Sequence, residues 1–167
     1  MDRPLVYDDV RSDLCPALVE IFLAMEAASG GTAASNNRGG WKSRFIINDD
    51  EPPSLVALRR AIVARVGERP PARRKVQGPA IISWAMINRK GAEHPRHHHP
   101  GVPLTCVYFV TSGNPPIPTC FECQDGTELP VAPVPGRLVI CLGDMWHRVP
   151  AYPGEEPRIT FITDVQS

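Results

Sequence analysis

Four of the five histidines fall in one short segment, HPRHHHP, at residues 94–100. In an extended strand, alternate side chains share a face, so His97 and His99 point to one side while His98 points to the other. Two imidazoles on one face can bind the same metal ion at about 2 Å each. This spacing predicts two ligands of a metal site.

A third ligand has to come from elsewhere in the chain, and His147 is the best candidate. It directly follows RLVICLGDMW (137–146), an apolar segment typical of a strand. We therefore predict a metal site built from His97, His99 and His147, with His94 and His98 as solvent-facing neighbours rather than ligands. The alternative is an incidental, histidine-rich basic patch.

Arg158 opens the last apolar segment, RITFITDV (158–165). Strand alternation places Arg158, Thr160 and Ile162 on one face. An arginine that faces the inside of a small β-structure needs a partner, because burying an isolated charge is very costly. We expect either an anionic ligand or a salt bridge to Asp144 or Glu155.

The composition favours one globular domain rich in turns. The chain has 167 residues, and its 18 Lys and Arg balance its 18 Asp and Glu, so the net charge is zero. No basic footprint for nucleic acid or a membrane surface is evident. The 19 Pro and 13 Gly mostly separate apolar runs, as they do between short strands.

The apolar pattern changes from helical to extended along the chain. Residues 12–28 and 54–66 show helical spacing, whereas the later runs read as strands: 79–88, 104–110, 121–123, 137–142 and 158–165. No helical segment separates these strands, so the sheet should be largely antiparallel. We predict a mainly β fold, a jelly roll with helices packed on one side. Residues 1–167 would form a single domain, with a helical part at 1–78 and a β-core at 79–167.

Targeting signals and a disulfide framework are not expected. The N-terminal segment, MDRPLVYDDVRSD, is too acidic for a signal peptide, and no run approaches the length of a membrane span. The five cysteines are odd in number and irregularly spaced, so Cys120 and Cys123 are expected to be thiols in or beside a strand. A cytoplasmic protein follows, and a homodimer stays open.

Several blocks of the sequence resemble one enzyme family. They are SNNRGGWKS (35–43), SWAMINR (83–89), HHHPGVPLTCVYFV (97–110) and the segment from PGRLVICLGDMWHRV to RIT (135–160). Together they resemble 2-oxoglutarate- and Fe(II)-dependent oxygenases related to prolyl 4-hydroxylases. The resemblance implies a double-stranded β-helix, which is a cupin-like jelly roll, together with Fe(II), 2-oxoglutarate as cosubstrate and O2.

The resemblance also implies roles for single residues. His97 and His147 match the two metal histidines, and Arg158 matches the residue that binds the far carboxylate of 2-oxoglutarate. Tyr108 lies on the strand that lines the cosubstrate pocket, and Asn88 falls in a matching motif, as does Trp41. Position 99 departs from the pattern, because most members have a carboxylate there. His99 is therefore the expected third ligand, and Glu93 or Asp144 stays an alternative.

The expected activity is that of a 2-oxoglutarate-dependent dioxygenase that oxidises, by hydroxylation, a C–H bond of a small molecule. Two alternatives stay open: a cupin-type three-histidine dioxygenase that does not use 2-oxoglutarate, and a non-catalytic metal- or ligand-binding module. The sequence specifies neither the substrate nor the native metal.

Overall fold

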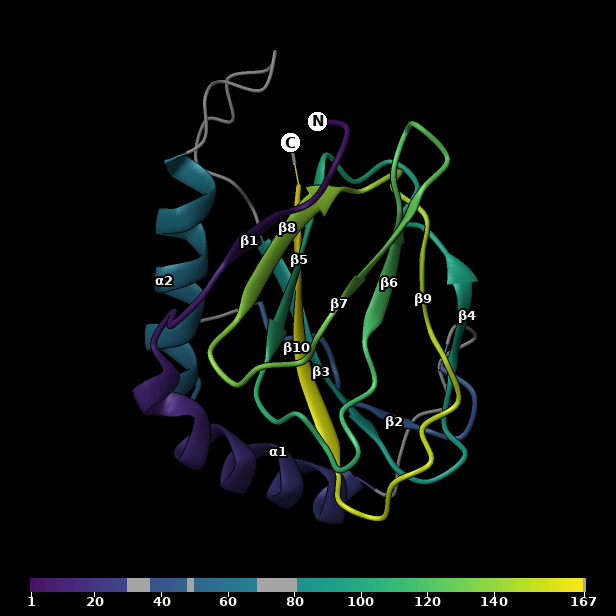
Figure 1. The fold of residues 1–167 in the computed structure, drawn as a ribbon. Coiled ribbons are helices and arrows are strands. Elements are labelled where there is room, and N and C mark those ends of the chain that lie inside the picture. The colour runs from purple at the N-terminus through teal and green to yellow at the C-terminus, as the bar shows by residue number, and fades with distance from the viewer. Residues whose placement is uncertain (30–36, 48–49, 69–80, 167) are drawn as a thin grey trace.

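The computed structural model describes residues 1–29, 37–47, 50–68 and 81–166 of the chain. Within these residues, two antiparallel β-sheets lie against each other and two helices cover the outer side of the larger sheet (Figure 1). The arrangement agrees with the predicted mainly β fold with helices on one side.

The larger sheet supplies most of the framework. Its strands lie in the order β1 (Leu5–Tyr7), β8 (Leu138–Leu142), β5 (Leu104–Phe109), β10 (Arg158–Val165), β3 (Ile81–Asn88) and β2 (Trp41–Lys42). The smaller sheet has the order β4 (His94–His97), β9 (His147–Val149), β6 (Thr119–Glu122) and β7 (Glu128–Val131). Neighbouring strands pair antiparallel throughout the described residues.

The predicted helices are confirmed with small shifts at their ends. A 3-10 turn, η1 (Ser12–Leu14), leads into α1 (Cys15–Ser29), and α2 spans Pro53–Gly67. Proline suits the first turn of α2 because the N–H that it lacks has no helical partner there. None of the described helices is long and apolar enough to cross a bilayer.

The N-terminal part is not purely helical, because it also contributes β1 and β2 to the larger sheet. β1 pairs with β8 at one edge of the sheet, and β2 pairs with β3 at the other. The boundary that the sequence suggested at residue 78 lies outside the described residues.

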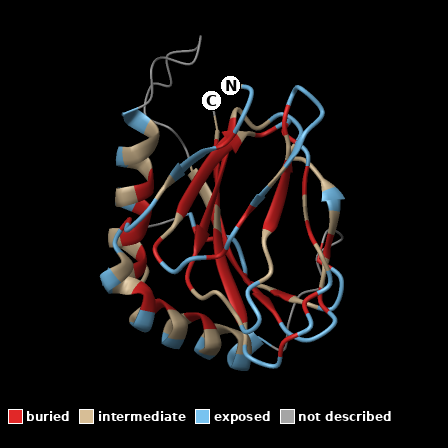
Figure 2. Cartoon of the chain, viewed as in Figure 1, coloured by how far each residue is buried: buried red, intermediate tan, exposed pale blue. Residues whose placement is uncertain are grey.

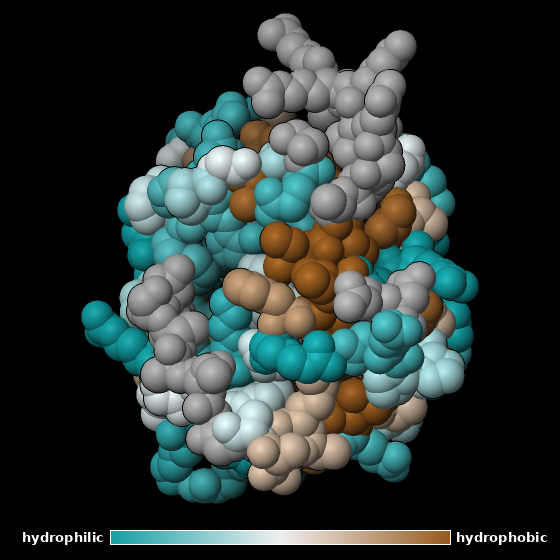
Figure 3. Space-filling model, turned by 180° about the vertical axis from the view of Figure 1, so that it is seen from behind, coloured by the Kyte–Doolittle hydropathy of each residue, from teal (hydrophilic) through white to brown (hydrophobic). Residues whose placement is uncertain are grey.

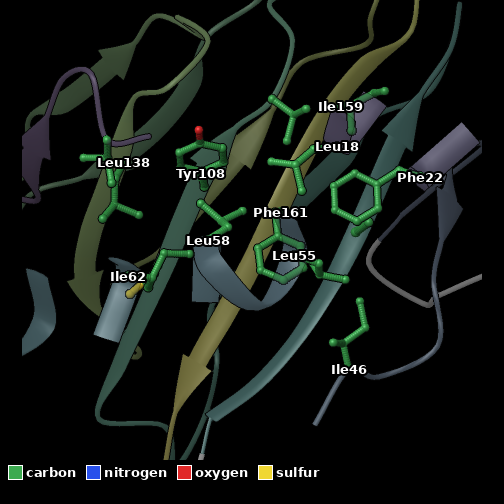
Figure 4. Close-up of a cluster of buried hydrophobic side chains, with 14 of the residues drawn as sticks. Leu18, Phe22, Ile46, Leu55, Leu58, Ile62, Tyr108, Leu138, Ile159 and Phe161 are labelled. Carbon is green, nitrogen blue, oxygen red and sulfur yellow. The ribbon is translucent and has the colours of Figure 1, made fainter. Parts of the chain in front are cut away.

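The main core fills the space between the helices and the larger sheet (Figures 2 and 4). Leu18 and Phe22 of α1 and Leu55 of α2 have no exposed surface. The ring of Phe22 stacks on that of Phe161 from β10, with 5.6 Å between centroids and 13° between planes. This packing fixes one face of β10 against the helices.

Strand alternation gives β10 two different faces. Ile159 and Phe161 pack into the main core, whereas every second residue starting from the first one of the strand faces the space between the two sheets. Those residues are Arg158, Thr160, Ile162 and Asp164. β10 therefore holds the helices on one side and a polar row on the other, as the spacing around Arg158 predicts.

Candidate metal centre

The three predicted histidines converge between the sheets. His97 ends β4 and His147 begins β9, and the two residues face each other directly across the antiparallel pair. His99 lies two residues beyond His97. The ring centroids are 4.3 Å apart for His97 and His147, 5.3 Å for His99 and His147, and 5.5 Å for His97 and His99. One nitrogen from each ring lies within 4.8 Å of the others.

Hydrogen bonds fix which nitrogen faces the centre. Nδ1 of His97 lies 2.7 Å from the carbonyl oxygen of Pro95, and Nδ1 of His147 lies 3.0 Å from that of Met145. A carbonyl oxygen can only accept, so each Nδ1 carries the hydrogen. Each Nε2 then keeps its lone pair, which is the form that binds a metal.

His99 is held by a carboxylate instead. Its Nδ1 lies 2.8 and 3.0 Å from the two carboxylate oxygens of Asp164, and the hydroxyl of Thr105 donates to one of them at 2.9 Å. His99 therefore also presents Nε2 with a free lone pair. All three histidines thus have the tautomer that a metal site requires.

Asp164 is the carboxylate that the sequence analysis missed. The candidates named there lie elsewhere: Glu93 pairs with exposed Arg38, and Asp144 is exposed and outside the histidine cluster. Strand alternation could have indicated Asp164, because it continues the row of Arg158, Thr160 and Ile162 at the same spacing of two residues.

Burial favours the neutral form of three of the histidines, among them His94, which was expected to face solvent and is instead only 8% exposed. Burial lowers the pKa of His147 to about 3, and repulsion from His97 and His99 adds to the effect. Burial likewise lowers the pKa of His94 to about 3, together with repulsion from Arg158 and from His97 and His147. The pKa of His97 is lowered by burial, although its bond to the Pro95 carbonyl opposes the shift. Neutral imidazoles are competent to bind a cation without first losing a proton.

These shifts predict an acid-sensitive fold. His94 and His147 titrate near 6.5 when unfolded but near 3 when folded, so between these values the unfolded chain binds more protons. Their stabilisation is present above about pH 6.5 and is lost as the pH falls toward 3. Between pH 8 and pH 5, we expect the metal-free protein to lose roughly 2 kcal/mol of unfolding free energy per histidine. Urea unfolding at fixed pH measures this loss. In His94→Gln the loss of unfolding free energy between pH 8 and pH 5 should be smaller by the contribution of one histidine. An unchanged loss would contradict the lowered pKa of His94.

A cavity of about 340 Å³ lies beside the histidines, between the two sheets. Its wall is mostly apolar, with Trp84, Met86 and Ile162 from the larger sheet and Val149 from the smaller one. Phe45 also lines it and is 55% exposed, so the cavity reaches the surface there. The face seen from behind carries a gathering of apolar side chains among polar ones (Figure 3). The volume of the cavity between the sheets suits a small organic ligand.

Lys42 lines the same cavity. Its ammonium lies 4.4 Å from the ring centre of Trp84 and 4.8 Å from that of Phe45. Burial lowers the pKa of Lys42, and the negative charge of Asp164 opposes that shift. Lys42 and Asp164 are therefore close enough to interact through space.

Arg158 reaches the cavity from β10 and is 1% exposed. Its guanidinium donates to the carbonyl of Ile117 at 3.2 Å and to the hydroxyl of Thr119 at 2.9 Å. Burial lowers its pKa to about 10, so it is still charged at neutral pH. Both partners are neutral acceptors.

No carboxylate among the described residues lies within ion-pair distance of Arg158. Among the described residues, Arg158 therefore forms neither of the two salt bridges expected as alternatives. Glu155 pairs with Lys90 at 2.6 Å, and Asp144 is exposed. A buried cation on a cavity wall without a counter-charge favours an anionic ligand.

Asn88 lies next to this arginine, since the two residues pair across β3 and β10. Its Oδ1 lies 3.0 Å from Nε2 of His94, which lines the cavity. Its Nδ2 is buried without a hydrogen-bond partner among the described groups. Asn88 is not among the residues that line the cavity, so its part in binding a cosubstrate stays a prediction. Thr160, the remaining predicted cofactor residue, does line the cavity.

Tyr108 is placed differently from the expectation. Its side chain lies in the main core, where the hydroxyl contacts Sγ of Cys15 at 3.3 Å and donates to the carbonyl of Arg11 at 3.1 Å. Its neighbour Val107 lines the cavity instead. Trp41 also lies in the main core, with Nε1 donating to Ser29. Neither aromatic residue is part of the site.

Comparisons with known proteins identify the fold. No protein-family model and no curated protein matches the sequence. Among solved structures, a prolyl-4-hydroxylase from Pseudomonas putida is similar, with a TM-score of 0.74 and 19% identity over 98% of this chain and 91% of that one. A prolyl hydroxylase from Trichoplax adhaerens, in complex with a hypoxia inducible factor peptide, has a TM-score of 0.81 and 12% identity over 99% and 84%.

A third similar structure is HygX from Streptomyces hygroscopicus with nickel and 2-oxoglutarate bound, with a TM-score of 0.66 and 10% identity over 98% of this chain and 83% of that one. At these identities the likeness establishes the fold. The predicted double-stranded β-helix is thereby confirmed.

Proposed function

We propose that this protein is an Fe(II)- and 2-oxoglutarate-dependent oxygenase that oxidises a C–H bond of a small molecule. One observation carries the proposal: a buried arginine without a counter-charge shares a cavity with three histidines whose Nε2 atoms face one point. The first feature fits a dianionic cosubstrate, and the second fits a divalent metal.

The residues divide into two groups by what they would hold. His97, His99 and His147 would bind Fe(II), and three neutral nitrogens leave coordination positions free for other ligands. Arg158 would bind the far carboxylate of 2-oxoglutarate, because a guanidinium can donate two parallel hydrogen bonds to a carboxylate. Fe(II) with 2-oxoglutarate and O2 supplies an oxidant for C–H bonds, with succinate and CO2 as co-products.

The apolar remainder of the cavity suits the substrate. Trp84, Ile162 and Phe45 would contact an apolar part of the molecule and keep water from the reacting bond. The similar structures include HygX, which has nickel and 2-oxoglutarate bound, and this supports the choice of cofactor. We place the protein in the cytoplasm, because all five cysteines are free thiols, as expected in a reducing compartment.

A three-histidine dioxygenase that does not use 2-oxoglutarate is the second candidate. The absence of a carboxylate among the three converging residues favours it. Arg158 argues against it, since such an enzyme has no dianionic cosubstrate to balance the buried charge.

Succinate formation distinguishes the two candidates. With Fe(II), ascorbate, 2-oxoglutarate and air, we expect succinate to appear in proportion to enzyme, as measured by proton NMR. Nitrogen in place of air should stop it, and so should His97→Ala, because each removes a required component. Oxidation of added thiols by O2 with no succinate would instead support the three-histidine dioxygenase.

A further inference from the structure

We propose that Asp164 is a positioning residue that supplies the negative charge of the metal centre through His99. It would not bind the metal itself. It would orient the ring of His99, fix its tautomer and make Nε2 a stronger donor. This inference rests on the proposed metal site and assigns a part of it that none of the three histidines provides.

The contact between the two residues is short and enclosed. Nδ1 of His99 lies 2.8 Å from one carboxylate oxygen of Asp164 and 3.0 Å from the other, and the two side chains are 12% and 11% exposed. Contact with both oxygens restrains the imidazole ring, because rotation in either direction lengthens one of the two distances. In contrast, the Nδ1 atoms of His97 and His147 each face a neutral backbone carbonyl.

Asp164 is itself held in place by the larger sheet. It lies opposite Thr105 in the pairing of β10 with β5, and the Thr105 hydroxyl donates to it at 2.9 Å. Lys42 provides a positive charge within electrostatic range. These contacts hold the carboxylate of Asp164 in place to accept the hydrogen on Nδ1 of His99.

A carboxylate in this position changes the ligand in two ways. An acceptor on Nδ1 selects the tautomer with Nε2 free and increases the electron density that Nε2 offers to a metal. The negative charge also attracts the bound cation, and that attraction is stronger in a partly buried site than in water. His99 and Asp164 together thus act as one anionic ligand unit, whereas His97 and His147 are neutral ligands.

The test compares Asp164→Asn with Asp144→Asn, an exposed control that lies outside the histidine cluster. Nickel is the probe, titrated by calorimetry. Loss of an outer hydrogen-bonding partner weakens metal binding by about 10–100-fold, so we expect that loss in Asp164→Asn and none in Asp144→Asn. In a His99→Ala background, Asp164→Asn should weaken nickel binding by a clearly smaller factor, since only the through-space attraction of the charge remains there; an equal factor in both backgrounds would overturn the role through His99.

A second readout needs no metal. Long-range nitrogen–proton NMR of the metal-free protein at neutral pH reports the tautomer of each histidine. We expect His99 to carry its hydrogen on Nδ1 in the wild type and to lose that preference in Asp164→Asn. His97 and His147 should keep theirs in both proteins, because their carbonyl partners are unchanged.

The outcomes separate this inference from the proposed function. Wild-type nickel affinity in Asp164→Asn, with His99 still protonated on Nδ1, would overturn the role of Asp164 and leave the metal site standing. A wild type that binds no nickel but shows the tautomer change would overturn the metal site alone. Should Asp164→Asn fail to fold, Thr105→Val takes its place. This variant removes the hydroxyl that restrains the position of the Asp164 carboxylate, so we expect a several-fold loss of nickel affinity. Unchanged affinity would overturn the inference.

Discussion

His97→Ala and His147→Ala should each lower the affinity for Fe(II) or nickel by at least about a hundredfold. A structural metal site with four protein ligands binds with roughly 10–16 kcal/mol, or about 3 kcal/mol per ligand. A change of about 3 kcal/mol corresponds to more than a hundredfold in affinity. The two histidines occupy directly paired positions on β4 and β9 and offer nitrogens within 4.8 Å of each other, so removing either leaves only two of the three converging ligands. Calorimetric titration under nitrogen measures the change.

His98→Ala is the matched control. The ring of His98 packs against Trp146 with 4.3 Å between centroids, and His98 is not one of the converging residues, although it borders the cavity. Its removal should alter metal affinity by less than about threefold. Loss of metal in His98→Ala with retention in His97→Ala would mean that the strand register around residue 98 is wrong by one residue.

Arg158→Ala should raise the dissociation constant for 2-oxoglutarate at least tenfold and leave nickel affinity nearly unchanged. A hydrogen bond to a charged group contributes about 1.5–3 kcal/mol, and one such bond is enough for a tenfold effect. The arginine is not one of the converging residues and donates to Ile117 and Thr119, so its removal does not take away a metal ligand. Titration of the nickel-loaded protein with 2-oxoglutarate under nitrogen gives both constants.

Arg148→Ala provides the control for the loss of an arginine. Arg148 forms an exposed pair with Glu128 on the outer side of the smaller sheet, so its loss should not affect 2-oxoglutarate. Arg158→Lys should recover part of the affinity, because lysine keeps the charge but not the planar pair of donors. A wild type that does not bind 2-oxoglutarate at all would refute the oxygenase and favour the three-histidine dioxygenase.

Alternation along strands made much of the site predictable. Spacing of two residues grouped His97 with His99 and Arg158 with Thr160, and the structure places all four on the cavity. The same rule could not orient β5, because all of its residues, Leu104–Phe109, are buried and apolar character marks neither face. For Tyr108 only the family resemblance indicated the cosubstrate pocket, and its side chain lies in the main core instead.

Contacts between residues far apart in the chain could not be predicted from the sequence. Asp164 and His99 are 65 positions apart in the chain, and their contact depends on how the larger sheet, which holds β10, lies against the smaller one, which holds β4. The absence of a carboxylate beside Arg158 is likewise a result of packing, since Glu155 lies only three residues away but pairs with Lys90. Local spacing predicts which face a side chain takes, whereas the pairing of charges depends on the assembled sheets.

The two paired histidines belong to the smaller sheet, whereas His99 is held by a residue of the larger sheet. A metal ion bound to all three would therefore connect the two layers through the hydrogen bond between His99 and Asp164. Separating the sheets would then require breaking this hydrogen bond to a metal ligand as well as exposing apolar surfaces. Metal binding would reduce the relative motion of the two cavity walls. The ion that supports the chemistry would therefore also limit how far the pocket can widen.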